Sequence, residues 1–551
     1  MKNEEKKQVK IVILGGGISG LSALRELQKT LDSKCIELTL IECEDSVGGK
    51  IQSIPHKMAD GQTILYHDIG PHTFRTKGSG LTTLKTIVEL GLADDLVSPV
   101  KGAFRRMIYH RGALRELTSC AVLWLVSWRL LMRKVFSYLL LGSYSAHIVQ
   151  PVGSPSVHRF LMDNFGSKFA RIVGKSMVRG IFAGDSHNVS VSDAFPAVLS
   201  MLNSAPSKMI EIFKTLAAVF CKSVGNLFKR RFTGSSPEQN SEILQSINCR
   251  VAVLAGRSSI YTLRNGMAVL PQTIYQQTKI DPRVNYVLST KICGLYKCSS
   301  RKEKSSGQSQ FLIKLDRAGE SHEISADFVI SAIPADKLLR ILLGSRVRSQ
   351  GDTNKFTHTS PVFGTAIKRC LSSISFRSVT VVNFHAEKKD LSLPEAFGYL
   401  TNEQQDPILG VIFDSSAFPK RYPEYLSVCT VMIRSQARSD TQFSEDRDWY
   451  IPYALKAIAR VDKNSYTEPT LAYPSNSASY LQPDNVYEWV ESIPQYTAGY
   501  VQRVAELRTL LQSENPSFVV CGSSYDGISV NDALLSGIIQ GAHPIIEALE
   551  R

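Results

Sequence analysis

An apolar run that ends in three consecutive glycines lies near the start of the chain, in the stretch VKIVILGGGISGLSAL, residues Val9–Leu24. Six mostly apolar residues predict a buried strand, and the glycines allow a sharp turn with close backbone approach. The spacing is Gly15-x-Gly17-x-x-Gly20, and a helix is predicted over residues 21–27. This layout is typical of a dinucleotide-binding turn, in which a pyrophosphate lies against a helix N-terminus.

A second apolar run, Ile36–Ile41, ends in Glu42, which follows Gly20 by 22 positions. A carboxylate at about this spacing binds a ribose hydroxyl in dinucleotide-binding units. The strand, turn, helix and second strand together have the length of one βαβ unit. A tight turn in some other α/β protein is the alternative that these residues leave open.

The composition sets the broad class of the protein. A chain of 551 residues with 43% hydrophobic and 21% charged residues is globular and long enough for two or three domains. The net charge of +14 indicates an anionic partner, such as a membrane lipid or an acidic substrate. Nucleic acid is not expected, because no basic motif with interleaved aromatic residues occurs.

The ten cysteines form no CxxC pair, and the histidines form no ligand-spaced cluster with them. We therefore expect neither a metal site, structural zinc included, nor a disulfide framework. Reduced thiols in an intracellular compartment are expected instead. The hydrophilic N-terminus MKNEEKKQVK leads directly into the first strand. Such a start has no room for a cleaved signal, so import into an organelle would need an internal signal.

The segment Ala121–Gly142 is highly apolar but carries basic residues, among them Arg129 and Arg133. Its longest uncharged piece is shorter than the ~20 residues of a spanning helix. Trp124 and Trp128 lie one helical turn apart, as do the two arginines. This pattern favours a helix lying in a membrane interface, and a buried helix with solvent-facing arginines is the alternative.

Further elements are predicted along the chain. Strands are expected at 104–109, 284–295 and 327–334, and a turn leading into a helix at 266–274. The last two strands would extend the nucleotide-binding sheet. Residues 221–258 have the composition of an exposed connection.

The C-terminal stretch VVCGSSYDGISVNDALLSG, residues Val519–Gly537, resembles the C-terminal flavin-binding segment of the protoporphyrinogen oxidase family. Other stretches are similar to further motifs of that family, and the resemblance runs through nearly the whole chain. These stretches are Gly180–Asp185 with Ala194–Pro196, Phe397–Leu400 with Leu409–Pro419, Thr430–Met432, and Ile493–Tyr496.

The resemblance implies an α/β (α+β) fold with a Rossmann-like FAD-binding domain, a mixed-sheet substrate domain and a helical membrane-binding domain. The implied segments are 1–97, 259–335 and 493–551 for FAD, 98–114 and 336–492 for substrate, and 115–258 for the helical domain. It further implies the penultimate step of haem biosynthesis: oxygen-dependent, six-electron oxidation of protoporphyrinogen IX to protoporphyrin IX, with release of hydrogen peroxide. A peripheral position on the mitochondrial inner membrane is implied for a eukaryotic protein. A second copy of the chain and the next enzyme of haem synthesis are further candidate partners.

The resemblance also assigns roles to individual residues. FAD is expected to contact several separate segments, and to be non-covalent because the one nearby cysteine, Cys521, precedes the flavin contacts expected in the C-terminal segment. The cofactor-binding residues are Gly15, Gly16, Gly17, Ile18, Ser19, Gly20, Glu42, Cys43, Lys50, Gly70, Pro71, His72, Thr73, Ile292, Ser523, Ile528, Ser529 and Val530.

Arg106 matches the arginine that pairs with a substrate propionate, a role that suits guanidinium because it offers two parallel donors. The residues that match the apolar walls around the macrocycle are Phe397, Gly398, Leu400 and Met432. No residue is assigned as a general acid or base.

Two positions depart from the family pattern: Lys50 replaces a frequent aromatic residue and His72 a frequent arginine. Two other functions stay open. One is an amine oxidase of the same fold, in which Tyr496 and Tyr525 would form an aromatic cage. The other is a catalytically inactive membrane flavoprotein that acts as a scaffold.

Overall fold

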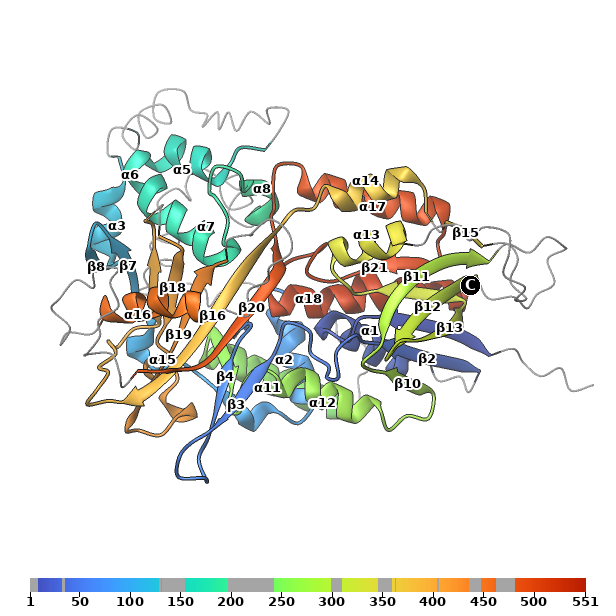
Figure 1. Cartoon of the computed structure of the whole chain (residues 1–551), viewed down its shortest axis with the longest axis horizontal. Helices are drawn as coiled ribbons and strands as arrows, with labels where there is room; N and C mark the ends of the chain where they lie inside the picture. The colour runs from blue at the N-terminus through green and yellow to red at the C-terminus, as the bar shows by residue number, and fades with distance from the viewer. Residues whose placement is uncertain are drawn as a thin grey trace, which may run out of the picture.

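The structure is a computed structural model, shown in Figure 1. The dinucleotide-binding elements lie at one end of the molecule and a helical cluster at the other, with the long strands β16 (Phe376–Glu387) and β20 (Pro483–Pro494) running between them. The structure describes residues 8–31, 35–127, 130, 154–196, 242–298, 310–344, 359–361, 363–403, 406–435, 447–461 and 481–551.

A parallel five-stranded sheet contains the glycine-rich turn. Its strands, in spatial order, are β10 (Val284–Val287), β2 (Ile36–Ile41), β1 (Val9–Leu14), β14 (Phe328–Ser331) and β21 (Phe518–Val520). The apolar runs predict these strands because a parallel sheet covered by helices is buried on both faces. The structure thus confirms that strands near residues 284 and 327 extend this sheet, and the C-terminal region supplies its edge. It corrects the single strand predicted at 284–295: only Val284–Val287 joins this sheet, and a turn with a positive φ at Ser289 leads into Lys291–Cys298, which pairs in a separate antiparallel sheet.

Helix α1 (Ile18–Thr30) packs against the C-terminal helix α18 (Val530–Ser536) and the π-helical turn after it. The Ser19 hydroxyl donates to the carbonyl of Ala533 at 2.7 Å, and Ser22 donates to Leu534 at 2.9 Å. Both serines are buried, so these bonds satisfy groups that would otherwise be unpaired. The two ends of the chain are therefore joined beside the glycine turn.

Smaller sheets and helices surround this core. The additional helices are α2 (Gly80–Glu89), α11 (Glu242–Arg257), α12 (Val269–Thr278), α13 (Ala335–Gly344), α14 (Thr365–Ser372), α17 (Tyr500–Glu514) and α19 (His543–Glu550). The additional strands are β11 (Lys291–Cys298), β12 (Phe311–Arg317), β13 (Glu320–Ala326) and β15 (Thr359–Pro361) in one sheet, β3 (Ser53–Lys57) and β4 (Ile64–Asp68) in a hairpin, and β5 (Phe74–Arg75), β6 (Leu96–Val97) and β9 (Ile260–Leu263) in a third group.

A mixed seven-stranded sheet forms the second large unit. Its spatial order is β20, β16, β19 (Leu426–Arg434), β18 (Ile408–Ile412), β17 (Gly398–Thr401), β7 (Arg106–His110) and β8 (Ala113–Glu116). Only the β17–β7 pair is parallel among these strands. Helix α16 (Ile451–Ala459) covers one face, where Val382, Val431 and Ala457 share a core. The other face carries Val381 and Met432.

The helical cluster consists of α3 (Ser119–Leu125), α5 (Val157–Phe165), α6 (Ser167–Phe169), α7 (Lys175–Phe182) and α8 (Val191–Ala194). Its side chains Phe160 and Phe169 belong to a core that continues to Tyr500 of α17. Most of the segment 121–142, with Trp128, Arg129 and Arg133, lies outside the described residues. Among the residues that are described, no helix is both long and apolar enough to cross a bilayer.

The structure corrects the prediction of an exposed connection at 221–258, as far as this range is described. Residues Glu242–Arg257 form helix α11, which packs against α2 and buries Leu254 in the core beside the five-stranded sheet. Most other side chains of the helix are exposed. Apolar residues also lie on the exposed side of this helix, where Val253 is 46% exposed, so no single apolar stripe marks it as amphipathic in the sequence.

Replacing Gly537 tests how the C-terminus is joined to α1. A Cβ atom at this position would lie 2.0 Å from the carbonyl oxygen of Ser19, so Gly537→Ala must displace backbone. We expect the free energy of unfolding, measured by urea titration, to fall by about 1–3 kcal/mol.

Gly256→Ala is the matched control. Nothing lies within 4 Å of a Cβ built on Gly256, which belongs to helix α11. Alanine is a better helix former than glycine by up to about 1 kcal/mol, so this variant should keep or gain stability. A Gly537→Ala protein as stable as the parent would contradict the predicted backbone clash.

Candidate active site

The glycine turn and Glu42 form the first part of the site. The Gly15 N–H donates to the carbonyl of Ile41 at 2.8 Å, and the Gly16 N–H donates to Glu42 Oε2 at 2.6 Å. Gly17 precedes α1 in an extended conformation, and no side chain caps this end of the helix. The first N–H groups of α1 thus have no capping side chain, as a bound pyrophosphate requires.

Two further loops meet this turn. Gly49 lies against Gly17, where a Cβ on Gly49 would come within 3.0 Å of the Gly17 Cα. Gly70 lies still closer to the loop that carries Lys50, since a Cβ on Gly70 would be 1.8 Å from the Lys50 carbonyl oxygen. The structure therefore brings Lys50 and the Gly70–Thr73 loop together, as predicted for neighbours of the same ring system.

The other predicted cofactor residues lie next to Glu42, at the start of β11 and near the C-terminus. The Thr290 N–H donates to the Glu42 carbonyl at 3.0 Å, which places Ile292 at the Glu42 corner. Cys43 Sγ lies 3.1 Å from Glu42 Oε1. At the C-terminus, Ser529 caps α18 by accepting from the Asp532 N–H. Ser523 and Ile528 are half-buried in the segment before that helix, whereas Val530 packs into the core.

A buried ion pair lies behind the Gly70–Thr73 loop. Asp68 Oδ2 is 2.8 Å from Arg421 Nη1, and the two side chains are 0% and 1% exposed. Asp68 Oδ1 also accepts from Ser53 Oγ at 2.6 Å and from the Met267 N–H at 2.8 Å. Asp68 comes from the hairpin strand β4 and Arg421 from the loop before β19, so the pair joins the two large units.

His72 forms a second buried pair with Asp414, its Nδ1 lying 2.9 Å from Asp414 Oδ1. Burial alone would lower the pKa of His72, but the Asp414 carboxylate outweighs this effect, so the pKa lies above its ordinary value. Burial would likewise raise the pKa of Asp414, but His72 and the Thr430 hydroxyl hold it below its usual range. His72 Nε2 is buried with no hydrogen-bond partner among the described residues.

Lys50 is half-buried and its Nζ donates to the carbonyl of Ser492 in β20. Burial is the largest cause that lowers its pKa, to about 8, and the nearby Lys337 acts in the same direction. Asp336 opposes the shift. The Lys50 ammonium therefore loses its proton more easily than an ordinary lysine.

Four of the five predicted substrate residues share one face of the seven-stranded sheet. Arg106 of β7 pairs in register with Gly398 of β17, and Leu400 lies two residues further along the same strand. Gly410 of β18 lies in register with both Leu400 and Met432. Residues in register across neighbouring strands point to the same side, so the four line one surface.

This surface is turned toward the Gly70–Thr73 loop. Asn383 lies in the same registered row as Gly398 and Arg106, and its amide donates to the Asp68 carbonyl at 3.4 Å. Further along the sheet, Trp489 Nε1 donates to the carbonyl of Ile69 at 2.6 Å. The sheet face that carries the predicted substrate residues thus meets the loop that carries the predicted flavin contacts.

Phe397, the fifth predicted substrate residue, does not lie on this surface. It precedes β17 and packs edge-on against Phe418, with 6.0 Å between ring centroids. It lies in a small core with Val97 and Ala103, beside the common surface rather than on it.

Helix α7 closes one end of this surface. Gly180 of α7 packs directly against the Leu400 side chain. The turn after α7 is held by Gln495, whose amide donates to the Phe182 carbonyl at 2.8 Å. Two of the sequence motifs, 180–185 and 493–496, are therefore in contact beside the predicted substrate residues.

The tyrosines that an amine-oxidase cage would need are packed in the interior. Tyr496 is 6% exposed and stacks on Tyr500 with 4.2 Å between ring centroids. Tyr525 is 5% exposed in the same core. Their packing gives no support to a cage that presents both rings to a small amine.

The geometry fits a flavin adenine dinucleotide: uncapped α1 N–H groups for a pyrophosphate, Glu42 beside them, and the adjoining loops that carry Lys50 and Gly70. The model of the family described as flavin containing amine oxidoreductase matches residues 18–540. The chain belongs to this family and is a FAD-dependent oxidoreductase.

Within this family, the chain belongs with the protoporphyrinogen oxidases. It is 30% identical to protoporphyrinogen oxidase of Homo sapiens over 543 residues, covering 96% of each chain. It is 23% identical to coproporphyrinogen III oxidase of Bacillus subtilis, again covering 96% of each. The fold matches a solved protein from Exiguobacterium sp. with a TM-score of 0.63 at 16% identity, covering 98% of this chain and 99% of the other.

Several residues of the site escaped sequence reasoning. Asp414, Thr430 and Arg421 were not assigned roles, although the first two lie in stretches that resemble family motifs. The sequence signal that could have pointed to the buried pairs was the run His67–His72, in which charged and imidazole side chains lie at the end of a strand and just after it. Their partners lie more than 300 positions away, and no local pattern connects them.

The His72–Asp414 pair predicts a pH-dependent stability. The ordinary pKa of histidine is about 6.5, and that of His72 lies higher in the folded protein. The stabilisation is therefore complete below pH 6.5 and is lost as pH rises through the folded-state pKa. With FAD in excess, His72→Gln should lower the free energy of unfolding by about 3–5 kcal/mol at pH 6, and by less at pH 9.

The measurement is urea unfolding of parent and variant at both pH values. His322→Gln serves as the control, because His322 is exposed on β13 and should have little effect at either pH. An equal penalty for His72→Gln at pH 6 and pH 9 would show that the charged pair is not the cause.

Proposed function

We propose that the chain oxidises protoporphyrinogen IX to protoporphyrin IX with molecular oxygen, in the penultimate step of haem biosynthesis. One observation carries the proposal. Arg106, Gly398, Leu400 and Met432 lie on one sheet face that is turned toward the Gly70–Thr73 loop. The curated relatives named protoporphyrinogen oxidase support the same substrate class.

The chemistry divides between cofactor and protein. Bound FAD supplies the two-electron acceptor for the reaction. Six hydrogen atoms leave the macrocycle in all, and three oxygen molecules take them up as three molecules of hydrogen peroxide. The protein binds and orients: Leu400 and Met432 present apolar surface to a flat macrocycle, and Gly398 lets it approach the strand closely.

Arg106 provides the polar contact in this arrangement. It lies at the exposed start of β7, at the end of the registered row, where a propionate can remain hydrated on one side. A guanidinium binds such a carboxylate through two parallel hydrogen bonds, which fixes the orientation of the ring as well as its position. The exclusion of water falls to the apolar side chains on the same face.

The direct test is aerobic incubation of the purified protein with protoporphyrinogen IX, with porphyrin fluorescence and peroxide measured together. Coproporphyrinogen III should be compared in parallel, since a relative bears that substrate in its name. Acid precipitation of the same preparation should release the flavin into the supernatant if FAD is non-covalent. Absence of porphyrin and peroxide from a flavin-loaded protein would favour an inactive scaffold, and turnover of a primary amine would favour an amine oxidase.

Arg106→Ala should weaken substrate use while leaving FAD binding intact. Loss of a charge-assisted pair costs about 1.5–3 kcal/mol, or roughly 10- to 150-fold in kcat/KM. Arg105→Ala is a matched control, because Arg105 is adjacent but pairs with Glu116 at 2.6 Å. If both variants lose activity equally, or if Arg106→Ala loses flavin, then Arg106 has a structural role instead.

We further propose that the segment 121–142 attaches the protein to a membrane surface, which for a eukaryotic protein would be the mitochondrial inner membrane. The described start of this segment supports the proposal: Trp124 of α3 is 86% exposed, whereas Val122 and Val126 are buried. Tryptophan is favoured at the headgroup boundary, and basic residues further along the sequence suit anionic lipid. A poorly soluble substrate would reach the site from that surface.

Trp124→Ser should bind vesicles of phosphatidylcholine and cardiolipin roughly 10- to 150-fold more weakly, because burying a large apolar side chain contributes about 1.5–3 kcal/mol. The control is Ile280→Ser, which removes another exposed apolar side chain, 78% exposed, beside β10. Arg129→Glu with Arg133→Glu should weaken binding further at low salt. Ile280→Ser should bind as the parent does. Unchanged vesicle binding of both the Trp124 variant and the double arginine variant would overturn the attachment site.

A further inference from the structure

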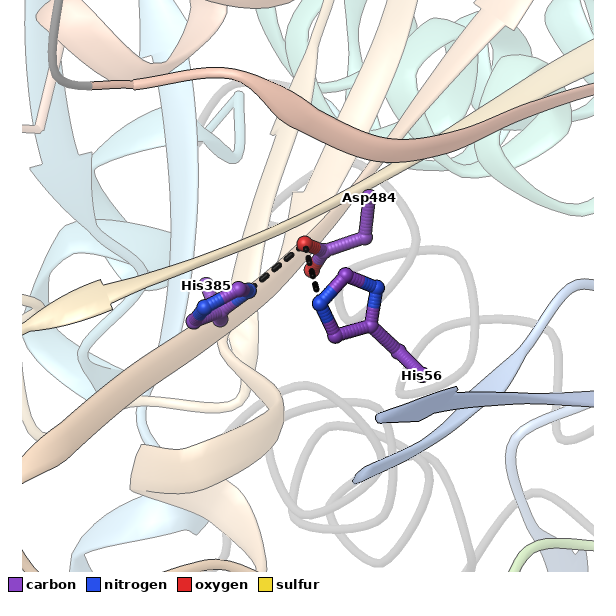
Figure 2. Close-up of side chains that lie close together, drawn as sticks. All are labelled: His56, His385 and Asp484. Carbon is purple, nitrogen blue, oxygen red and sulfur yellow. Dashed lines mark hydrogen bonds and ion pairs between the residues drawn. The ribbon is translucent and has the colours of Figure 1, made fainter. Parts of the chain in front are cut away.

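Three histidines surround one buried carboxylate where the β3–β4 hairpin meets strands β16 and β20. Asp484 is 3% exposed, and its Oδ1 lies 2.6 Å from His385 Nδ1 and 3.6 Å from His56 Nε2. Its Oδ2 lies 2.8 Å from His67 Nε2. Figure 2 shows the side chains of His56 and His385 converging on one carboxylate oxygen of Asp484.

The four residues come from four different strands. His56 lies on β3, His67 on β4, His385 on β16 and Asp484 at the start of β20. The sequence reasoning excluded a metal site because no histidines occur at ligand spacing. The fold assembles this group across the sheet edges, where spacing along the chain gives no signal.

The donor atoms have the chemistry and proximity of a metal site. His56 Nε2, His385 Nδ1 and a carboxylate oxygen of Asp484 all lie within 4.8 Å of one another. Zinc binds imidazole nitrogen and carboxylate oxygen at about 2.0–2.2 Å, so the ligands of one ion lie about 3–3.5 Å apart. Small side-chain rotations of His56 and His385, which are partly exposed, would bring the three atoms to that spacing.

The exposure of the three histidines suits a bound ion, which needs an open side for entry and a buried side that fixes its ligands. The side chains of His56 and His385 are 32% and 24% exposed, which leaves one side open for a water ligand and for entry of the ion. His67 is 1% exposed, and neither of its ring nitrogens has a hydrogen-bond partner among the described residues, nor does Asp484 Oδ2. His67 Nε2 still lies 2.8 Å from Asp484 Oδ2, and a buried histidine beside the second oxygen of a ligating carboxylate is typical of the shell around metal ligands.

We propose that His56 Nε2, His385 Nδ1 and Asp484 Oδ1 bind a divalent zinc ion, with His67 as the positioning residue for the carboxylate. The site lies on the hairpin that continues into Asp68 and the Gly70–Thr73 loop. The ion therefore links the hairpin to β16 and β20, and its role is structural.

The test uses the FAD-loaded full chain with its exposed thiols blocked by N-ethylmaleimide, because Cys43, Cys249 and Cys293 could bind zinc themselves. Equilibrium dialysis against zinc, with the metal counted by mass spectrometry, should give one saturable ion per chain. His56→Gln with His385→Gln should weaken binding at least tenfold. His322→Gln, which removes an exposed histidine outside the group, should bind as the parent does.

Two further measurements separate zinc binding from folding. His67→Gln should weaken zinc binding about 10- to 100-fold. Because His67 is buried beside Asp484, the zinc-free variant should also melt at a lower temperature, so zinc affinity is compared at a temperature where both proteins are folded. X-ray absorption of the parent protein should show only nitrogen and oxygen ligands, with imidazole scattering and no sulfur at about 2.3 Å. A sulfur shell, no saturable zinc, or zinc binding unaffected by the double substitution would overturn the proposal.

Discussion

The buried pair between Asp68 and Arg421 is the interaction on which the site depends. Both side chains are essentially inaccessible to water, so each charge would be costly to bury alone. Further hydrogen bonds hold the pair, since Asp68 accepts from Ser53 and Arg421 Nη2 donates to the carbonyl of Tyr66 at 3.2 Å, whereas Arg421 Nε has no partner among the described residues. Burial lowers and the Asp68 carboxylate raises the pKa of Arg421, with a net increase, so the guanidinium stays charged.

The position of this pair explains how the seven-stranded sheet can carry the predicted substrate residues and also hold the Gly70–Thr73 loop in place. Arg421 belongs to the unit of the seven-stranded sheet, and Asp68 ends the strand that leads into the Gly70–Thr73 loop. Asn383 and Trp489 add hydrogen bonds from the same sheet to the carbonyls of Asp68 and Ile69. Side-chain hydrogen bonds to backbone carbonyls thus hold the strands with the predicted substrate residues against the loop with the predicted flavin contacts, and a redox reaction needs such a fixed geometry.

The local patterns in the sequence were enough to predict the βαβ unit, the later strands of its sheet and the class of cofactor. The glycine turn, the run before Glu42 and the strand at 327–334 each carry their signal within about ten residues. The buried pairs carry no such signal, because His72 and Asp414 are 342 positions apart and Asp68 and Arg421 are 353 apart.

Individual side-chain roles were also beyond the sequence. Ser19 lies in the predicted pyrophosphate turn, yet its hydroxyl donates to Ala533, 514 positions away. Helix α11 resembled a connection because it buries only Leu254 among its described side chains. Both differences have one cause: the partner that decides a side chain's role comes from a distant part of the chain, and tertiary contacts override local pattern.

The two departures from the family pattern are accounted for by the same junction. Lys50, in place of an aromatic residue, donates to the Ser492 carbonyl of β20. His72, in place of an arginine, pairs with Asp414, which also accepts from Thr430 of β19. Each substituted side chain carries a donor that reaches across to the seven-stranded sheet. Both side chains therefore contribute to the contact between the two units, beside the close backbone approach of Gly49 and Gly70.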